Sequence, residues 1–339
     1  MKKIALMVFL ALLIAGVFGY TYYKDVTEPN TAFSKPQKAL YIGTNSTFED
    51  LLNQLVGDSI IADTASFLWV AEQKNFFNNV KPGHYIINNG ASNNDLVNLL
   101  RSGNQTPIKL IFNAARTPQE LAGKLADQLE ADSISLLQAL TSEDLAKEYG
   151  FNKESYRTMF IPNTYEIWWN TDANGFVEKM AIEYKKFWNE KKIAAAKERG
   201  LSQSEVGILA AIVKAETAMR SEAPIVAGLY LNRLERGIPL QADPTLIYAS
   251  GDFTIKRVLD KHKEIESPYN TYKYGGLPPG PINYPDVNYL QAVLSPEKHN
   301  YIYMCAKADF SGSHNFSKSL RQHNVYAREY VRAIRKAGY

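Results

Sequence analysis

The sequence is poor in the residues that build disulfides and metal sites. Only one of its 339 residues is a cysteine, Cys305, so no internal disulfide and no cysteine-based metal site can form. Alternating apolar residues around Cys305 predict a strand with a buried thiol. The five histidines are scattered, and no His-Glu-x-x-His motif occurs. We therefore expect neither a metal ion nor another cofactor.

Motifs of several common reaction classes are also missing. There is no glycine-rich phosphate loop and no Gly-x-Ser-x-Gly elbow, which argues against nucleotide chemistry and serine hydrolysis. The net charge is only +3 and no block of like charge stands out, so we expect no nucleic-acid partner. What remains for catalysis is acid–base chemistry by carboxylates.

Length and composition indicate a globular protein of more than one domain. The hydrophobic share of 45% and the charged share of 22% are ordinary, and 339 residues allow two domains with a sizeable core. Predicted strands and helices follow each other in mixed order. The fold class that we expect is α+β.

A long apolar run lies at the amino terminus. Lys2 and Lys3 precede it, and residues 4–23 are long enough to cross a bilayer as one helix. The lysines predict that residues 1–3 lie in the cytoplasm and that the chain after residue 24, with the catalytic domain, lies on the extracytoplasmic side of the inner membrane. The competing interpretation is a cleaved signal peptide, although no Ala-x-Ala site is present. Residues 24–38 contain two prolines and no periodicity, which predicts a linker.

Residues 39–104 predict a small unit of strands and helices. The order is strand, helix, helix, strand and helix, with elements near 41–42, 47–55, 65–77, 80–87 and 94–100. The turn Lys81-Pro82-Gly83-x-Tyr85 precedes the second strand. In size, element order and this turn, the segment resembles the LysM-like subdomain found in front of some cell-wall enzymes.

Residues 105–339 predict a larger mixed domain. A strand is expected at 108–112, a strand after an aromatic loop at 160–169, and helices at 118–130, 133–140, 142–149, 174–197 and 222–236. In the last helix Ile225, Leu229 and Leu234 should face inward, and Gly237 should end it. Three loops rich in turn residues follow, at 240–245, 268–272 and 275–282, and their density indicates the wall of a site.

Glu216 is the strongest catalytic candidate. Ser202 and Glu205 form a capping box, and Leu209, Ile212 and Val213 then define the apolar stripe of a helix. Glu216 lies on the same stripe, where partial desolvation favours its protonated form. A neutral carboxylic acid beside a cleft can act as a general acid. The alternative is a structural Glu that reaches solvent or pairs with Lys214 or Arg220.

Two further carboxylates are candidates with strong structural explanations. Glu222 begins a predicted helix, where a negative charge is favoured by the helix dipole alone. Asp243 precedes Pro244, which is a common arrangement in turns.

Short motifs in a fixed order resemble one enzyme family. They are Ala215-Glu216-Thr217, Asn232-Arg233-Leu234, Leu240-Gln241-Ala-Asp243-Pro244-Thr245, Tyr269-Asn270-Thr271-Tyr272 and Gly276-Leu-Pro-Pro-Gly-Pro-Ile282. Pro162-Asn-Thr-Tyr165 upstream, with His314-Asn-Phe316 and His323-Asn324 downstream, fits the same pattern. Together they resemble the endolytic murein transglycosylases, the YceG-like family. Asn163 departs from the pattern, since many relatives carry Asp there.

The resemblance implies a reaction and a site. The enzyme would be a lyase, a lytic transglycosylase that cuts peptidoglycan glycan strands between N-acetylmuramic acid and N-acetylglucosamine. It would leave 1,6-anhydro ends and so end nascent strands. Glu216 takes the catalytic role. The polar loop residues would bind the sugars, namely Gln241, Asp243, Thr245, Tyr269, Asn270 and Tyr272.

Two other functions stay open on the sequence alone. One is a glycoside hydrolase that pairs Glu216 with Asp243 or Glu222 to activate water, and the other is a non-catalytic scaffold that binds the cell wall. In each case the expected partners are glycan strands and the membrane. The family also suggests cell-wall synthases as partners.

Overall fold

The chain forms two compact units in the computed structural model, which describes residues 2–113 and 115–338. The N-terminal unit comprises residues up to 110 together with 128–130 and 166–171, and the C-terminal unit comprises the others. Helices and short two-stranded sheets are mixed throughout, so the predicted α+β class is confirmed.

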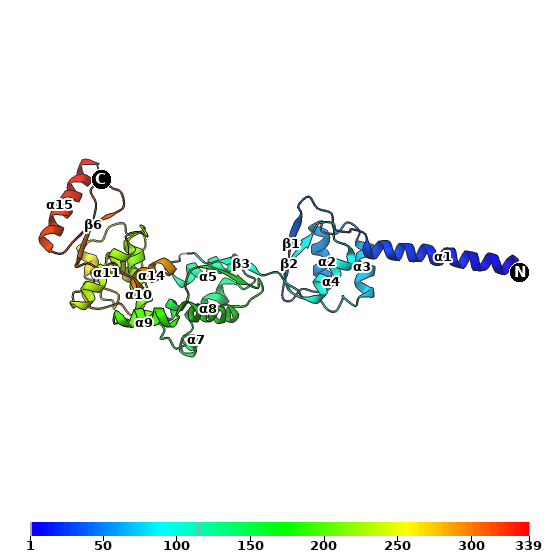
Figure 1. Ribbon diagram of the computed structural model, residues 1–339, viewed down its shortest axis with the longest axis horizontal. Coiled ribbons are helices and arrows are strands. Elements are labelled where there is room, and N and C mark those ends of the chain that lie inside the picture. Colours follow the sequence, from blue (N-terminus) through cyan, green and yellow to red (C-terminus); the bar gives the residue numbers. More distant parts are fainter. Residues whose placement is uncertain (1, 114, 339) are drawn as a thin grey trace. The chain divides into compact units, whose positions relative to one another are not determined.

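The N-terminal unit has the predicted order of strands and helices. Its elements are β1 (Gln37–Ile42), α2 (Phe48–Gly57), α3 (Thr64–Gln73), β2 (Gly83–Asn88) and α4 (Asn93–Ser102) (Figure 1). β1 and β2 pair antiparallel in a register from Gln37–Asn88 to Ile42–Gly83. Apolar side chains of both strands and all three helices form one core. The likeness to LysM stays a prediction.

The apolar run at the amino terminus forms a single helix. This helix, α1 (Lys2–Thr27), has 26 residues, none of them buried, and is long and apolar enough to cross a membrane. Only its last turns contact the N-terminal unit, where the ring of Tyr22 meets that of Trp69 edge-on at 5.2 Å.

The predicted linker at 24–38 differs from the structure, because its middle part is attached to the N-terminal unit. Asn30 is 6% exposed; its Nδ2 donates to Asn93 Oδ1 (2.7 Å) and to the carbonyl of Asp63 (2.8 Å). Its Oδ1 accepts from the backbone N–H of Asp63 at 2.7 Å. Thr31 is buried beside it and bonds the carbonyl of Asn88. Contacts that span about sixty residues leave no local pattern in the sequence.

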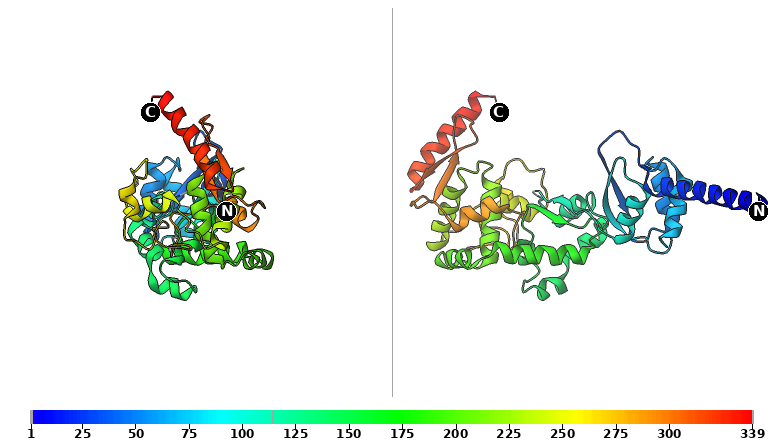
Figure 2. Two further views of the ribbon diagram at one scale, coloured as in Figure 1. Left: turned by 90° about the vertical axis from the view of Figure 1, so that its left-hand side faces the viewer. Right: turned by 45° about the vertical axis from the view of Figure 1, so that its right-hand side comes forward.

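The C-terminal unit is mainly helical. β3 (Ile108–Ile111) and β4 (Thr164–Ile167) form a two-stranded sheet, and the boundary between the units along the chain falls within each of these strands. The helices are α5 (Pro118–Ala126), α6 (Ser133–Thr141), α7 (Glu143–Glu148), η1 (Ser155–Met159), α8 (Ala173–Phe187), α9 (Glu190–Glu198), α10 (Gln203–Glu216), α11 (Ala223–Glu235), α12 (Asp243–Ser250), α13 (Asp260–Lys263), α14 (Val287–Leu294) and α15 (Leu320–Lys336). β5 (Tyr303–Ala306) and β6 (His314–Ser317) form a hairpin against α15, which is red in Figure 2.

Two predictions of secondary structure in this unit are wrong. The single helix expected at 174–197 is two helices, because the Asn189 side chain accepts a hydrogen bond from the backbone N–H of Lys192 and starts α9. The loop expected at 240–245 ends at Asp243, where α12 begins with Pro244 in its first turn. Cys305 does lie in a strand, β5, but it is half-buried and not fully buried.

Helix α10 is the centre of the C-terminal unit. Every residue from Val206 to Val213 is buried, and α11, α14 and η1 pack around it. Gly207 permits the approach of η1, since a Cβ there would lie 2.9 Å from Thr158 Cγ2. The end of α10 is thereby held in a fixed place.

We predict that Asn30→Ala destabilises the N-terminal unit by about 2–3 kcal/mol, because it leaves the Asp63 N–H and the buried Asn93 Oδ1 without partners. Hydrogen exchange of the β1 and β2 amides measures the opening free energy of this unit directly. Asn78→Ala, at an exposed asparagine, is the control and should change nothing. Unchanged protection in Asn30→Ala would show that the segment is only loosely attached.

Candidate active site

Glu216 is the last residue of α10. The predicted capping box is present, with the Ser202 side chain accepting from Glu205 N–H and the Glu205 carboxylate accepting from Ser202 N–H. Leu209, Ile212 and Val213 are buried as predicted. The helix ends at Thr217, whose backbone is extended, so Glu216 lies in the last turn.

The carboxyl group of Glu216 lies in an apolar environment with one strong hydrogen bond. The buried hydroxyl of Tyr230 donates to Glu216 Oε1 at 2.6 Å. Burial raises the pKa of Glu216 from 4.5 to about 7, the Tyr230 hydrogen bond lowers it, and the charge of Asp243 adds to the rise. A substantial fraction of the group is therefore protonated near neutral pH.

A cavity of about 330 Å³ lies against this carboxyl group. It is enclosed by the ends of α10 and α11, the segment 240–243, the β5 strand and α15. The side chains that line it are those of Glu216, Leu229, Tyr230, Arg233, Leu240, Gln241, Asp243, Tyr272, Ile302, Tyr303, Met304 and His323. The lining thus combines apolar and aromatic side chains with polar ones.

Three of the six predicted sugar-binding residues line the cavity of Glu216. They are Gln241, Asp243 and Tyr272. The Tyr272 hydroxyl donates to Asp243 Oδ1 at 2.5 Å, which ties the two loops together. Gln241 has a left-handed backbone with φ of +52°, and its Oε1 accepts from Arg233 Nη2 at 2.7 Å.

The other three predicted binding residues hold the loops. Thr245 is fully buried, and its hydroxyl bonds the carbonyl of Ala242 and the hydroxyl of Thr271. Asn270 is fully buried, and its Nδ2 donates to the carbonyls of two residues of the preceding loop. Tyr269 packs on the ring of Tyr248, 4.7 Å between centroids, and does not line the cavity of Glu216.

Tyr230 and Arg233 are functional residues that were not predicted from the sequence. Tyr230 belongs to none of the motifs, and Arg233 belongs to one but had no predicted role. Both are buried on α11, where Ile225 and Leu234, expected to face inward, are only half-buried. Arg233 donates to the carbonyls of Pro239 (2.7 Å) and Ile302 (2.7 Å). Both residues could have been found, because a tyrosine and an arginine three residues apart lie on an apolar helix face. A polar side chain on an apolar face is also what indicated Glu216.

Glu222, the second candidate carboxylate, has a structural partner. It is buried, and its two oxygens accept from the backbone N–H and from Nδ1 of His314, each at 2.8 Å. This pair ties the start of α11 to β6. Glu222 does not line the cavity of Glu216, whereas Asp243 does. Among the described residues, no group of three or more His, Cys, Asp or Glu is placed to hold a metal ion.

We predict that Tyr230→Phe raises the pKa of Glu216 above 7, because the hydroxyl stabilises the charged carboxylate. Carboxyl ¹³C NMR of the protein labelled at glutamate measures the shift. Tyr289→Phe is the matched control, since the Tyr289 hydroxyl donates to the carbonyl of Thr217 and not to a carboxylate. A pKa that stays the same or falls in Tyr230→Phe would contradict the electrostatic account of the site.

Comparisons with known proteins agree on one family. The sequence profile of the YceG-like family matches residues 40–329. The chain is 28% identical to an endolytic murein transglycosylase of Bacillus subtilis, over 94% of this chain and 91% of that one. It is 26% identical to an endolytic murein transglycosylase of Streptococcus pneumoniae, over 97% of this chain but only 65% of that longer protein.

The fold also has a counterpart among solved structures. A crystal structure of a yceG-like protein from Listeria monocytogenes superposes with a TM-score of 0.57 and 24% identity, covering 86% of this chain and 99% of that one. The match of the family profile extends over most of the sequence, from the first strand to α15. The chain therefore belongs to the YceG-like family.

Proposed function

We propose that this protein is a peptidoglycan lytic transglycosylase that cuts within glycan strands, with Glu216 as the acid and then the base. The observation that carries the proposal is the carboxyl group of Glu216, of which burial keeps a substantial fraction protonated near pH 7, beside a cavity with polar groups in its lining. The two relatives named endolytic murein transglycosylase support the choice of substrate.

The reaction needs one proton donor that can later accept a proton. Neutral Glu216 gives its proton to the oxygen between N-acetylmuramic acid and N-acetylglucosamine, and the bond from C1 to that oxygen breaks. The Glu216 carboxylate then takes the proton of the muramic acid 6-hydroxyl, whose oxygen bonds to C1. A 1,6-anhydro ring forms, no water is consumed, and Glu216 is protonated again.

The other cavity residues support these steps. Tyr230 holds the carboxyl group in one orientation and stabilises it while it is charged. Gln241, Asp243 and Tyr272 offer hydrogen-bonding groups to sugar hydroxyls and acetamido groups. Thr245, Asn270 and Tyr269 act indirectly, because their contacts hold the two loops that present those groups.

One observation favours a second candidate, a hydrolase. Asp243 lines the same cavity as Glu216, so it could activate a water molecule as an inverting hydrolase requires. Its carboxylate is engaged by the Tyr272 hydroxyl, which holds one oxygen. The two reactions differ in their products, since hydrolysis leaves a reducing end that is one water heavier than an anhydro end.

We further propose that α1 anchors the enzyme in the cytoplasmic membrane, with both compact units on the outer side. The length of α1 and the lysines at its amino end support this orientation. An enzyme held there would meet glycan strands as they are made. Cell-wall synthases are accordingly the protein partners that we expect.

Digestion of glycan strands by the full-length chain in detergent, followed by mass spectrometry of the ends, tests the proposal. We expect anhydro ends from the wild type and a loss of about 10³-fold in rate from Glu216→Gln. Glu235→Gln, at an exposed carboxylate on α11, is the control and should retain activity.

Three results would count against the proposal. Activity retained in Glu216→Gln would remove Glu216 from the mechanism. Ends one water heavier, lost in Asp243→Asn, would establish the hydrolase. If the wild type binds strands but cleaves none, the remaining interpretation is a non-catalytic scaffold that binds the cell wall.

A further inference from the structure

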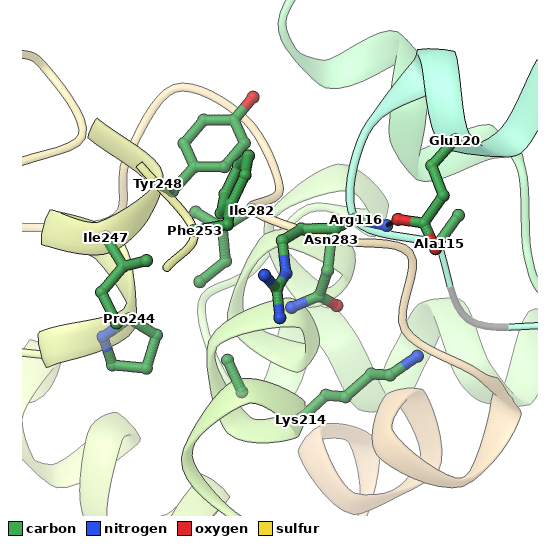
Figure 3. Close-up of a pocket in the computed structure, with 11 residues that line it drawn as sticks. Ala115, Arg116, Glu120, Lys214, Pro244, Ile247, Tyr248, Phe253, Ile282 and Asn283 are labelled. Carbon is green, nitrogen blue, oxygen red and sulfur yellow. Dashed lines mark hydrogen bonds between the residues drawn. The ribbon is translucent and has the colours of Figure 1, made fainter. Parts of the chain in front are cut away.

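A second cavity, of about 600 Å³, is also present in the C-terminal unit (Figure 3). Its lining comes from α10, α12, the start of α5 and the loop before α14. The residues are Ala115, Arg116, Glu120, Lys214, Ala215, Pro244, Ile247, Tyr248, Phe253, Ile282 and Asn283. The reaction described above uses none of these side chains.

At two points of the chain, consecutive residues line this cavity and the cavity of Glu216. On α10, Lys214 and Ala215 line this cavity and the next residue, Glu216, lines the other. On α12, Asp243 lines the cavity of Glu216 and the next residue, Pro244, lines this one. Ala215 is exposed and small, so no bulky side chain at that position separates the two. A strand bound at Glu216 would therefore present its neighbouring groups here.

The second cavity carries positive charge that is not balanced within the described residues. Among them, neither the Arg116 guanidinium nor Lys214 Nζ has a carboxylate within 4.0 Å, and Lys214 Nζ donates to the carbonyl of Tyr284 at 2.7 Å. The one carboxylate in the lining, Glu120, is paired with Lys124 at 2.7 Å, and its second oxygen accepts from the backbone N–H of Arg116 at 2.8 Å. A negatively charged ligand would complement this surface.

The wall of the cavity is held in place from behind. The buried guanidinium of Arg157 donates to the Tyr248 hydroxyl (2.6 Å) and to the carbonyl of Arg116 (2.8 Å). The Arg116 side chain lies over the ring of Phe253, 4.9 Å from its centroid. The backbone and the side chain of Arg116 are thus both positioned before any ligand arrives.

A polar group in the cavity also lacks a partner. Asn283 Nδ2 donates to the carbonyl of Ala211 at 2.7 Å, but its Oδ1 accepts no hydrogen bond from any described residue, although it is buried. Because this oxygen is buried, it is not presented to a ligand, and the groups that the cavity offers are the cations of Arg116 and Lys214.

We propose that this cavity binds the acidic stem peptide carried by muramic acid, and that the enzyme therefore prefers peptide-bearing strands. The inference rests on the proposed function, because it takes the glycan strand as the ligand at Glu216. A stem peptide carries carboxylates beyond the lactyl group of muramic acid, and these complement the cations of Arg116 and Lys214. The side chain of Arg116 is the principal contact.

Steady-state kinetics on two substrates test this assignment. One is a set of peptide-bearing strands, and the other is the same strands stripped by an amidase, which keep only the lactyl carboxylate. Arg116→Gln should raise KM for peptide-bearing strands about tenfold, leave kcat unchanged, and change KM for stripped strands less than about twofold. Arg116→Glu should raise KM for peptide-bearing strands further. Arg116→Lys keeps the positive charge, so its KM for these strands should be close to that of the wild type.

The controls separate this inference from the function itself. Arg236→Gln removes an equal charge from an exposed position just after α11 that lines neither cavity, and it should behave as the wild type. The same comparison can be made without catalysis in the inactive variant Glu216→Gln. Its dissociation constants for both kinds of strand are measured with and without the additional substitution Arg116→Gln. If the wild type cleaves neither substrate, the proposed function fails, while the binding comparison still tests the cavity.

Two outcomes would overturn the assignment. An equal loss on peptide-bearing and stripped strands would place Arg116 on the sugar or its lactyl group rather than on the peptide. No change in KM or in binding on either substrate, with wild-type cleavage intact, would show that the cavity takes no part in substrate recognition.

Discussion

The removal of one carboxyl group from water is the constraint on which the site depends. Glu216 ends a helix that is buried along most of its length, and α11 packs beside it with Tyr230 facing the carboxyl group. Burial of an unpaired carboxylate has a high desolvation free energy, so the protonated form of Glu216 is favoured and its pKa rises. The one hydrogen bond from Tyr230 limits the rise in pKa and fixes the orientation. Helix packing thus produces a group that can both give and take a proton near neutral pH.

The rest of the cavity depends on a second buried side chain, Arg233. Its guanidinium binds the carbonyls of Pro239 and Ile302 and the side chain of Gln241, and so joins two segments, 239–241 and the chain before β5, to α11. Since Tyr230 lies one turn earlier on the same helix, the acid and the loops are positioned by one element. Buried charge that is satisfied by several hydrogen bonds gives this rigidity without an ion pair.

The sequence predicted what is local. The capping box and the apolar stripe of α10 identified the helix of Glu216, and the order of elements in the N-terminal unit was right. The break at Asn189 had a local signal, a capping residue, that a continuous helical pattern concealed. Apolar residues at helical spacing therefore predicted the presence of helices reliably, but they predicted the residues at which helices begin and end less well.

What the sequence did not predict is set by contacts between distant segments. Tyr230 meets Glu216 only because α11 turns back against α10, and no spacing rule gives that turn. In the loops after α11, the sequence could not distinguish Tyr272, which lines the cavity, from Asn270, which is buried and holds the loop. Both are polar turn residues, and only their backbone conformations decide which way each side chain points.

The pH dependence of kcat/KM on glycan strands tests the central claim most directly. If the active form carries a proton on Glu216, the rate constant should be level below pH 7 and fall about tenfold per pH unit above it. The midpoint should lie near 7, the pKa to which burial raises this carboxyl group. A rate constant that falls with a midpoint near 4.5, the ordinary value of a solvated glutamate, or one that keeps rising above pH 7, would contradict the account.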